Sequence, residues 1–149
     1  MIIRPARPEE AAVLSDLALR SKAYWGYDAE FLAACRAELT LDPGRLAAER
    51  TAVAEIDGRP AGLVSVLGEP PLGEIGMLFV DPEHIGSGVG GALWRHALAE
   101  ARAAGFGTLE LVADPGAVGF YLRMGARRAG EVPSESIPGR TLPLMTYHL

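Results

Sequence analysis

The chain has 149 residues, of which 49% are hydrophobic and 22% charged, and its formal net charge at pH 7 is -5. This length fits a single domain, residues 1–149, that can bury a core without disulfides or metals. The negative charge disfavours nucleic acid and anionic membranes as partners, because both attract clusters of Lys and Arg.

Several other protein classes are disfavoured by specific residues. Cys35 is the only cysteine, which excludes an internal disulfide framework and a cysteine-based zinc site. The three histidines show no spacing that indicates a shared metal, so we predict no metal site. No apolar run approaches the length of a membrane span, and the N-terminus lacks the pattern of a signal peptide. We therefore expect a cytoplasmic protein.

The first third of the chain predicts a short strand at residues 2–3 and a helix over residues 7–21, where apolar residues recur at helical spacing. A second amphipathic helix is expected over residues 28–39, with Asp28 as its N-cap. An aromatic patch separates the two helices: Tyr24, Trp25 and Tyr27.

The middle of the chain predicts an antiparallel meander. Residues 51–56 and 61–66 are two apolar runs joined by Asp57-Gly58, which is typical of a β-hairpin. A turn rich in proline and glycine at residues 68–73 leads to a third strand at residues 74–80.

The last part of the chain alternates helices and strands. A helix is expected over residues 88–104 and a strand over residues 109–112. Because this strand follows a crossover helix, it should run parallel to the strand at residues 74–80. A further helix at 115–124, strands near 126–129 and 142–148, and a surface loop at 133–140 complete the chain.

Six residues between the third strand and the following helix carry the main functional signal: Gly86, Ser87, Gly88, Val89, Gly90 and Gly91. Glycines allow a positive φ and a close approach of the backbone to a ligand. The unpaired N–H groups of the first helical turn attract an anion. This junction therefore predicts a phosphate-binding loop.

Two nucleotide-binding motifs are alternatives for this loop. Gly86, Gly88 and Gly91 satisfy G-x-G-x-x-G, and Glu110 lies about where an acidic ribose ligand would stand. In dinucleotide folds, however, the glycines follow the first strand, whereas here two helices and a meander precede them. The loop also lacks the Lys-Ser/Thr ending of a nucleoside triphosphate P-loop.

The order of elements and two motifs resemble the GNAT N-acetyltransferases over essentially the whole chain. The family signature of Arg or Gln, two residues, Gly, one residue, then Gly or Ala is matched from Ile85 to Gly90, with Ile85 in the first place. The stretch from Asp114 to Ala126 resembles the family's Asn-x-x-Ala-x-x-Phe-Tyr helix, with Asp114 in place of the Asn and Ala126 in place of a Phe.

This resemblance implies an α/β (α+β) fold with a mixed sheet of about six to seven strands, flanked by about four helices and splayed at an acetyl-CoA site. Acetyl-CoA is the implied co-substrate. Its pantetheine arm would pair with the 77–80 strand and its diphosphate would lie on the glycine loop. The implied cofactor-binding residues are Leu78, Phe79, Val80, Ile85, Gly86, Ser87, Gly88, Val89, Gly90, Gly91, Asp114, Ala117, Phe120 and Tyr121.

The resemblance also implies catalytic roles for two residues. Glu74 matches the general base of histone-acetylating relatives, and Tyr121 matches the tyrosine that protonates the departing sulfur of CoA. The alternatives are a solvated strand glutamate, with water carrying the proton, and a tyrosine that only packs between helix and sheet. Period-two alternation does not fix which face Glu74 occupies.

The expected reaction is acetyl transfer to a primary amine of a small molecule, amino acid, peptide or protein, by direct attack in a ternary complex. Tyr24, Trp25 and Tyr27 are the candidates for acceptor binding. A catalytically idle CoA-binding module is the alternative, and a nucleotide-dependent oxidoreductase comes third. A homodimer is compatible with the sequence.

Overall fold

The computed structural model describes residues 1–149 as one seven-stranded sheet in the order β1-β2-β3-β4-β5-β7-β6. The strands are β1 (Ile2–Pro5), β2 (Ala52–Ile56), β3 (Arg59–Glu69), β4 (Leu72–Val80), β5 (Thr108–Val112), β6 (Arg127–Pro133) and β7 (Thr141–His148). All neighbouring strands are antiparallel except β4 and β5, which are parallel. The predicted mixed sheet, with one parallel pair after the crossover helix, is confirmed.

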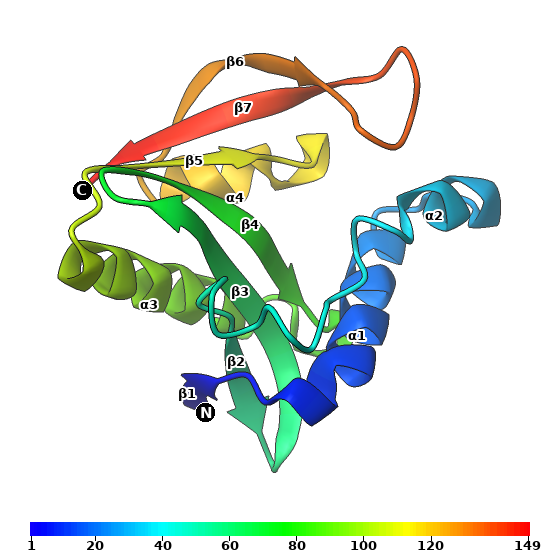
Figure 1. Ribbon diagram of the computed structural model, residues 1–149. Helices are drawn as coiled ribbons and strands as arrows, with labels where there is room; N and C mark the ends of the chain where they lie inside the picture. The colour runs from blue at the N-terminus through cyan, green and yellow to red at the C-terminus, as the bar shows by residue number, and fades with distance from the viewer.

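Four α-helices cover the two faces of the sheet (Figure 1). They are α1 (Ala11–Ala23), α2 (Ala29–Cys35), α3 (Val89–Ala104) and α4 (Val118–Arg123), with 3-10 turns η1 (Pro8–Glu10), η2 (Pro82–His84) and η3 (Pro115–Ala117). Helices α1 and α2 pack on one face, and α3 and α4 pack on the other. None of the helices combines the length and apolar character needed to cross a membrane.

Alternation along the strands divides the core into these two layers. On β2, Ala52 and Ala54 join the large cluster beneath α3, whereas Val53 joins the smaller cluster beneath α1. Trp94 of α3 is among the largest fully buried side chains of the large cluster. A strand apolar on both faces is the pattern expected where helices cover a sheet from both sides.

Several elements differ in their bounds from the sequence expectation. The helix expected from residue 7 begins at Ala11, after η1, and the strand expected near 126–129 runs from Arg127 to Pro133. The turn expected at residues 68–73 contains fewer residues in the structure, because the pairing of β3 with β4 continues as far as Glu69 and Leu72.

The second helix ends at Cys35 instead of Leu39. Beyond Cys35 the backbone forms i→i−3 hydrogen bonds, such as the one from the Arg36 N–H to the Ala33 carbonyl. The Thr40 hydroxyl also donates a hydrogen bond to the Arg36 carbonyl. The N-cap of this helix is as predicted: Asp28 accepts a hydrogen bond from the Phe31 N–H at 2.8 Å.

The parallel pair β4 and β5 is joined only at one end. Its register covers Leu72–Thr108, Gly73–Leu109 and Glu74–Glu110, and beyond Glu74 the two strands separate (Figure 1). A bulge on β4 leaves Gly76 unpaired with β3, between the Ile75 and Met77 positions. The N–H and C=O groups on this edge of β4 are therefore free of a neighbouring strand. The predicted splay of the sheet is confirmed.

Candidate active site

A cavity of about 650 Å³ occupies the opening between β4 and β5. Its wall includes β4, the turn before α3, the first turns of α3, the end of β5, and α4. All the cofactor-binding residues predicted from the sequence line it except Ser87 and Val89. Val89 is buried in the core, and the Ser87 hydroxyl donates to the His84 carbonyl. The glycine turn and the two flanking motifs thus meet at one cavity.

The glycine turn presents backbone to this cavity. Gly86 has φ +85° and Gly88 has φ +90°, a left-handed conformation that favours glycine. A Cβ added to either residue would meet nothing within 4 Å, so open space lies in front of both. Gly88 is also the N-cap of α3, and no side chain caps this end of the helix. The first N–H groups of α3 are therefore available to an anion.

Tyr121 lies in the cavity wall on α4 with only 7% of its surface exposed. Its ring packs edge-to-face against Trp94 and Phe120, at centroid distances of 5.7 and 5.1 Å. Burial raises the pKa of its hydroxyl well above the ordinary value, and the Asp114 carboxylate raises the pKa further. Tyr121 therefore carries its proton at neutral pH.

Glu74 lies on β4 where the splay begins, but it is not part of the cavity lining. Its neighbours Gly73 and Ile75 face the core under α3, so Glu74 points to the opposite face, the one covered by α1 and α2. Glu74 is exposed, but partial desolvation against the sheet raises its pKa, and the nearby carboxylates of Glu135 and Glu110 raise it further. A carboxylate with a raised pKa is suited to accepting a proton near neutral pH.

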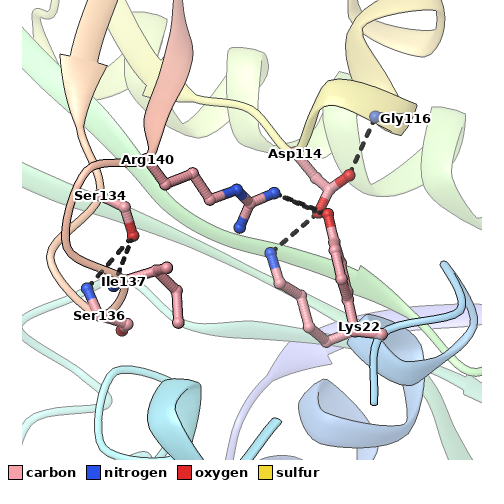
Figure 2. Close-up of polar contacts among 8 residues, drawn as sticks. Lys22, Asp114, Gly116, Ser134, Ser136, Ile137 and Arg140 are labelled. Carbon is pink, nitrogen blue, oxygen red and sulfur yellow. Dashed lines mark hydrogen bonds and ion pairs between the residues drawn. The ribbon is translucent and has the colours of Figure 1, made fainter. Parts of the chain in front are cut away.

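Asp114 is the centre of a polar network at the end of β5 (Figure 2). One carboxylate oxygen accepts hydrogen bonds from Lys22 Nζ at 3.0 Å and from the Tyr27 hydroxyl at 2.7 Å, while the other accepts from the Gly116 N–H at 2.9 Å. Arg140, from the β6–β7 loop, donates to the Tyr27 hydroxyl at 2.7 Å. The network joins α1, the α1–α2 segment, η3 and the β6–β7 loop.

The network fixes the charge of Asp114. Burial by itself would raise the pKa of this carboxyl, but the hydrogen bonds from Tyr27, Gly116 and Lys22 outweigh burial and lower the pKa. Tyr27 is further held by its stack on the Phe31 ring, at a centroid distance of 4.0 Å. Asp114 therefore remains ionised, with its carboxylate oxygens bound to protein donors.

The three aromatic candidates for acceptor binding are placed differently. Trp25 lines the cavity and packs over Gly116, where an added Cβ would come within 2.8 Å of the indole ring. Tyr24 packs edge-to-face on Trp25 but is itself exposed and outside the cavity lining. Tyr27 also lies outside the lining, and its hydroxyl is bound to Asp114.

Two cationic residues of the cavity wall, Lys22 and Arg95, were missed by the sequence reasoning. Lys22 has no local signal, because its partner Asp114 is 92 residues away in the chain. Arg95 follows Gly91 by four residues on α3, and helical periodicity could have placed it over the glycine turn. His84 and Arg123 also line the cavity.

Comparisons with known proteins agree on one family. The model of the acetyltransferase (GNAT) family matches residues 15–126. A GCN5-related N-acetyltransferase structure from Rhodopseudomonas palustris is 28% identical, with 99% of this chain and 95% of that chain covered and a TM-score of 0.80. The PaiA N-acetyltransferase of Thermoplasma acidophilum, solved with coenzyme A, is 17% identical, with coverage of 99% and 98% and a TM-score of 0.84.

A third solved structure is the ribosomal-protein-S18-alanine N-acetyltransferase of Escherichia coli. It is 17% identical, with 99% of this chain and 92% of that chain covered and a TM-score of 0.72. Among curated proteins, none matched the chain. At 17% identity, the likeness to the last two structures shows a shared fold.

Proposed function

This chain belongs to the GNAT acetyltransferase family, an acyltransferase family that uses acetyl-CoA as co-substrate, and we propose that it acetylates a primary amine by direct attack within a ternary complex. The single observation that carries this proposal is the cavity between β4 and β5. It joins an uncapped glycine turn, a free strand edge and a buried tyrosine hydroxyl. These groups match the diphosphate, the amides and the thioester sulfur of acetyl-CoA.

The cavity fits the co-substrate mainly through backbone. The free edge of β4 beyond Glu74 can pair with the two amides of the pantetheine arm, as an added strand would. The N–H groups after Gly88 can bind the diphosphate. A backbone N–H in the stretch 78–80 would stabilise the oxyanion of the tetrahedral intermediate. Side chains contribute little to these contacts. The same backbone contacts can therefore form although Ile85 replaces the Arg or Gln, and Asp114 the Asn, of the family pattern.

Glu74 is proposed as the general base. A primary amine is mostly protonated at neutral pH, since the reference pKa of a lysine amine is about 10.4. Glu74, directly or through water, accepts the proton that the amine must lose before its nitrogen attacks the thioester carbonyl carbon. The raised pKa of Glu74 and its position on the α1 and α2 face of the splay support this role.

Tyr121 is proposed as the general acid. When the new C–N bond forms, the C–S bond breaks and the sulfur leaves as a thiolate that needs a proton. Tyr121 lines the cavity, keeps its proton at neutral pH and has Asp114 nearby to favour the neutral phenol. It can therefore donate its proton to the sulfur and regain one from solvent before the next turnover.

The acceptor is proposed to enter beside Trp25, from the side covered by α1 and α2, where Tyr24 packs on Trp25 and the Tyr27 hydroxyl is bound to Asp114 behind the cavity wall. Structures with the same fold include an aminoglycoside 6'-N-acetyltransferase and an enzyme named for an alanine of a ribosomal protein. The acceptor class therefore spans small-molecule, amino acid, peptide and protein amines.

The proposal is tested by a thiol-release screen with purified protein, acetyl-CoA and a panel of polyamines, amino acids, aminoglycosides and peptides. The expected result is acceptor-dependent release of CoA thiol, with an acetylated amine identified by mass spectrometry. Binding of CoA with no release for any acceptor would favour an idle CoA-binding module instead. Tight binding of NAD in place of CoA would support the oxidoreductase alternative.

A further inference from the structure

Trp25 lies in the cavity wall, but the segment around it is held by side chains from distant parts of the chain. We infer that Arg140 is a positioning residue, which fixes Tyr27 and thereby keeps Trp25 in the wall where the acceptor amine binds. Arg140 is itself outside the cavity lining, so it acts through the residues that it contacts. The inference rests on the proposed function, because it takes the acceptor to enter beside Trp25.

The α1–α2 segment, which carries Trp25, belongs to neither helix, since α1 ends at Ala23 and α2 begins at Ala29. Its backbone forms a turn: the Trp25 N–H donates to the Lys22 carbonyl at 3.3 Å, and Gly26 has φ +86°. The Trp25 side chain is 43% exposed, so burial in the core does not fix it. Side-chain contacts must therefore hold this segment in place.

Asp114 binds the segment at both ends (Figure 2). The same carboxylate oxygen accepts a hydrogen bond from Lys22, which precedes Trp25 in the chain, and one from Tyr27, which follows it. The second oxygen accepts from the Gly116 N–H, and the Trp25 ring packs over Gly116. The Asp114 side chain is only 10% exposed, so water competes little for these bonds. The position of Trp25 therefore depends on whether Lys22 and Tyr27 both stay bound to Asp114.

Arg140 fixes the Tyr27 side chain from the β6–β7 loop. Its guanidinium donates to the Tyr27 hydroxyl at 2.7 Å, and that hydroxyl donates its own proton to Asp114. The guanidinium carbon also lies 4.8 Å from the centroid of the Phe31 ring, on which Tyr27 stacks. The Arg140 side chain is only 20% exposed, so these contacts are sheltered from solvent. Arg140 thus holds the tyrosine by a charge-assisted hydrogen bond and by cation–π attraction to the stacked rings.

The loop that carries Arg140 has a second, separate contact with the helical side of the molecule. The Ser136 hydroxyl donates to the Glu38 carboxylate, beyond the end of α2. Within the loop, the Ser134 N–H donates to the Arg140 carbonyl at 2.7 Å. Removal of the Arg140 guanidinium therefore leaves the loop attached while it frees Tyr27.

The first test is steady-state kinetics of Arg140→Met with the amine that the thiol-release screen identifies. Methionine keeps an apolar side chain but has no N–H donor. The KM for the amine should rise about tenfold, since a lost charge-assisted hydrogen bond is worth about one factor of ten. The kcat and the affinity for coenzyme A should change little, because only binding of the acceptor is weakened.

Arg4→Met is the matched control for this substitution. Arg4 donates to Glu10 at 2.8 Å and to Glu55 at 3.1 Å, and its side chain is 14% exposed. It lies outside the cavity lining. Arg4→Met should therefore lower the free energy of unfolding without changing the KM for the amine. An equal rise of this KM in Arg4→Met and Arg140→Met would reduce the effect to general destabilisation and overturn the inference.

A double variant shows whether Arg140 acts through Tyr27. Tyr27→Phe removes the hydroxyl that Arg140 binds, so adding Arg140→Met to Tyr27→Phe should raise the KM no further. If the effects of the two substitutions multiply instead, Arg140 contacts the acceptor directly and the positioning role is wrong.

Fluorescence measures the hold on Trp25 without any acceptor. The chain has two tryptophans, and Trp94 is only 1% exposed, so quenching by acrylamide reports Trp25. Quenching should increase in Arg140→Met but not in Arg4→Met, and unchanged quenching in Arg140→Met overturns the inference whatever the acceptor is. If the wild-type chain acetylates no amine, the proposed function fails and the link from Arg140 to acceptor binding fails with it. Increased quenching would in that case still support the hold of Arg140 on Trp25, so the two failures are distinguishable.

Discussion

The two sides of the cavity are built in different ways. One side is a short continuous segment, the glycine turn and the start of α3, and it offers backbone N–H groups. The other side is a network of side chains around Asp114, drawn from four separate segments (Figure 2). The difference teaches that a site built from backbone N–H groups depends on glycines at neighbouring positions in the chain. A side-chain network instead depends on the fold bringing together residues that are far apart in the sequence.

Tyr121 lies where the two sides meet, and its substitution should have the largest effect. Tyr121→Phe removes the proposed proton donor while keeping the ring, so kcat for acetyl transfer should fall about 100-fold, the lower range for a general acid. Binding of coenzyme A should change little. Steady-state kinetics and calorimetry on the same preparation measure both quantities.

Tyr147→Phe provides the control for this substitution. Tyr147 also packs edge-to-face on Trp94, at 5.6 Å, but lies outside the cavity lining. It should keep full activity. If Tyr121→Phe were as active as Tyr147→Phe, Tyr121 would have only a packing role.

The backbone side can be broken by adding a side chain. Gly88→Val places a β-branched residue at φ +90° and fills the open space in front of the turn, so binding of coenzyme A should weaken by a factor of about ten to one hundred. Gly58→Val is the matched control, since Gly58 has φ +77° and equally open surroundings at the β2–β3 turn, away from the cavity. Gly58→Val should lower the free energy of unfolding but leave the affinity for coenzyme A unchanged. Equal affinity for coenzyme A in both variants would contradict the assignment of the loop.

The same contrast explains what could be predicted from the sequence. The glycine turn was predictable because its requirements, positive φ and close approach, act within six neighbouring residues. The Asp114 network was not, because Arg140 and Tyr27 are 113 residues apart in the chain. The face of Glu74 could not be predicted either, because the bulge at Gly76 interrupts the period-two alternation and places Glu74 and Val80 on opposite faces of the sheet.

The side-chain network should contribute to stability more than to cofactor binding. Asp114→Asn keeps the shape but removes the charge that Lys22 and Tyr27 share, so the free energy of unfolding should fall by about 2 kcal/mol at pH 7. Because the pKa of Asp114 is lowered by folding, this stabilisation is present above the ordinary pKa of an aspartate. It should vanish as the pH falls through the lowered value. Urea unfolding at several pH values measures the difference.

Asp81→Asn is the comparison variant for the network. Asp81 also caps a 3-10 turn, but its ion-pair partner Arg20 is 53% exposed. A surface pair of this kind is expected to contribute less than about 1 kcal/mol. An equal fall in the free energy of unfolding for Asp114→Asn and Asp81→Asn would show that the Asp114 network stabilises no more than a surface ion pair. The proposed difference between the two sides of the cavity would then be wrong.

The smallest expected effect concerns the pH dependence of Glu74. If Glu74 is the base, activity rises with pH as its carboxyl loses its proton, and partial desolvation together with Glu135 and Glu110 moves this rise above the ordinary range of a glutamate. Glu135→Gln removes one neighbouring charge and should shift the acidic limb of the pH–rate profile to lower pH. Glu74→Gln should remove this limb and lower kcat.

Stability measurements separate this role from a structural one. A raised pKa means that the ionised form of Glu74 is less favourable in the folded chain than in the unfolded chain. Glu74→Gln should therefore raise the free energy of unfolding above the ordinary pKa of a glutamate, while it lowers the rate. A glutamate whose only function was structural would lose stability on this substitution. An unaltered acidic limb in Glu74→Gln would show that water or another group takes the proton.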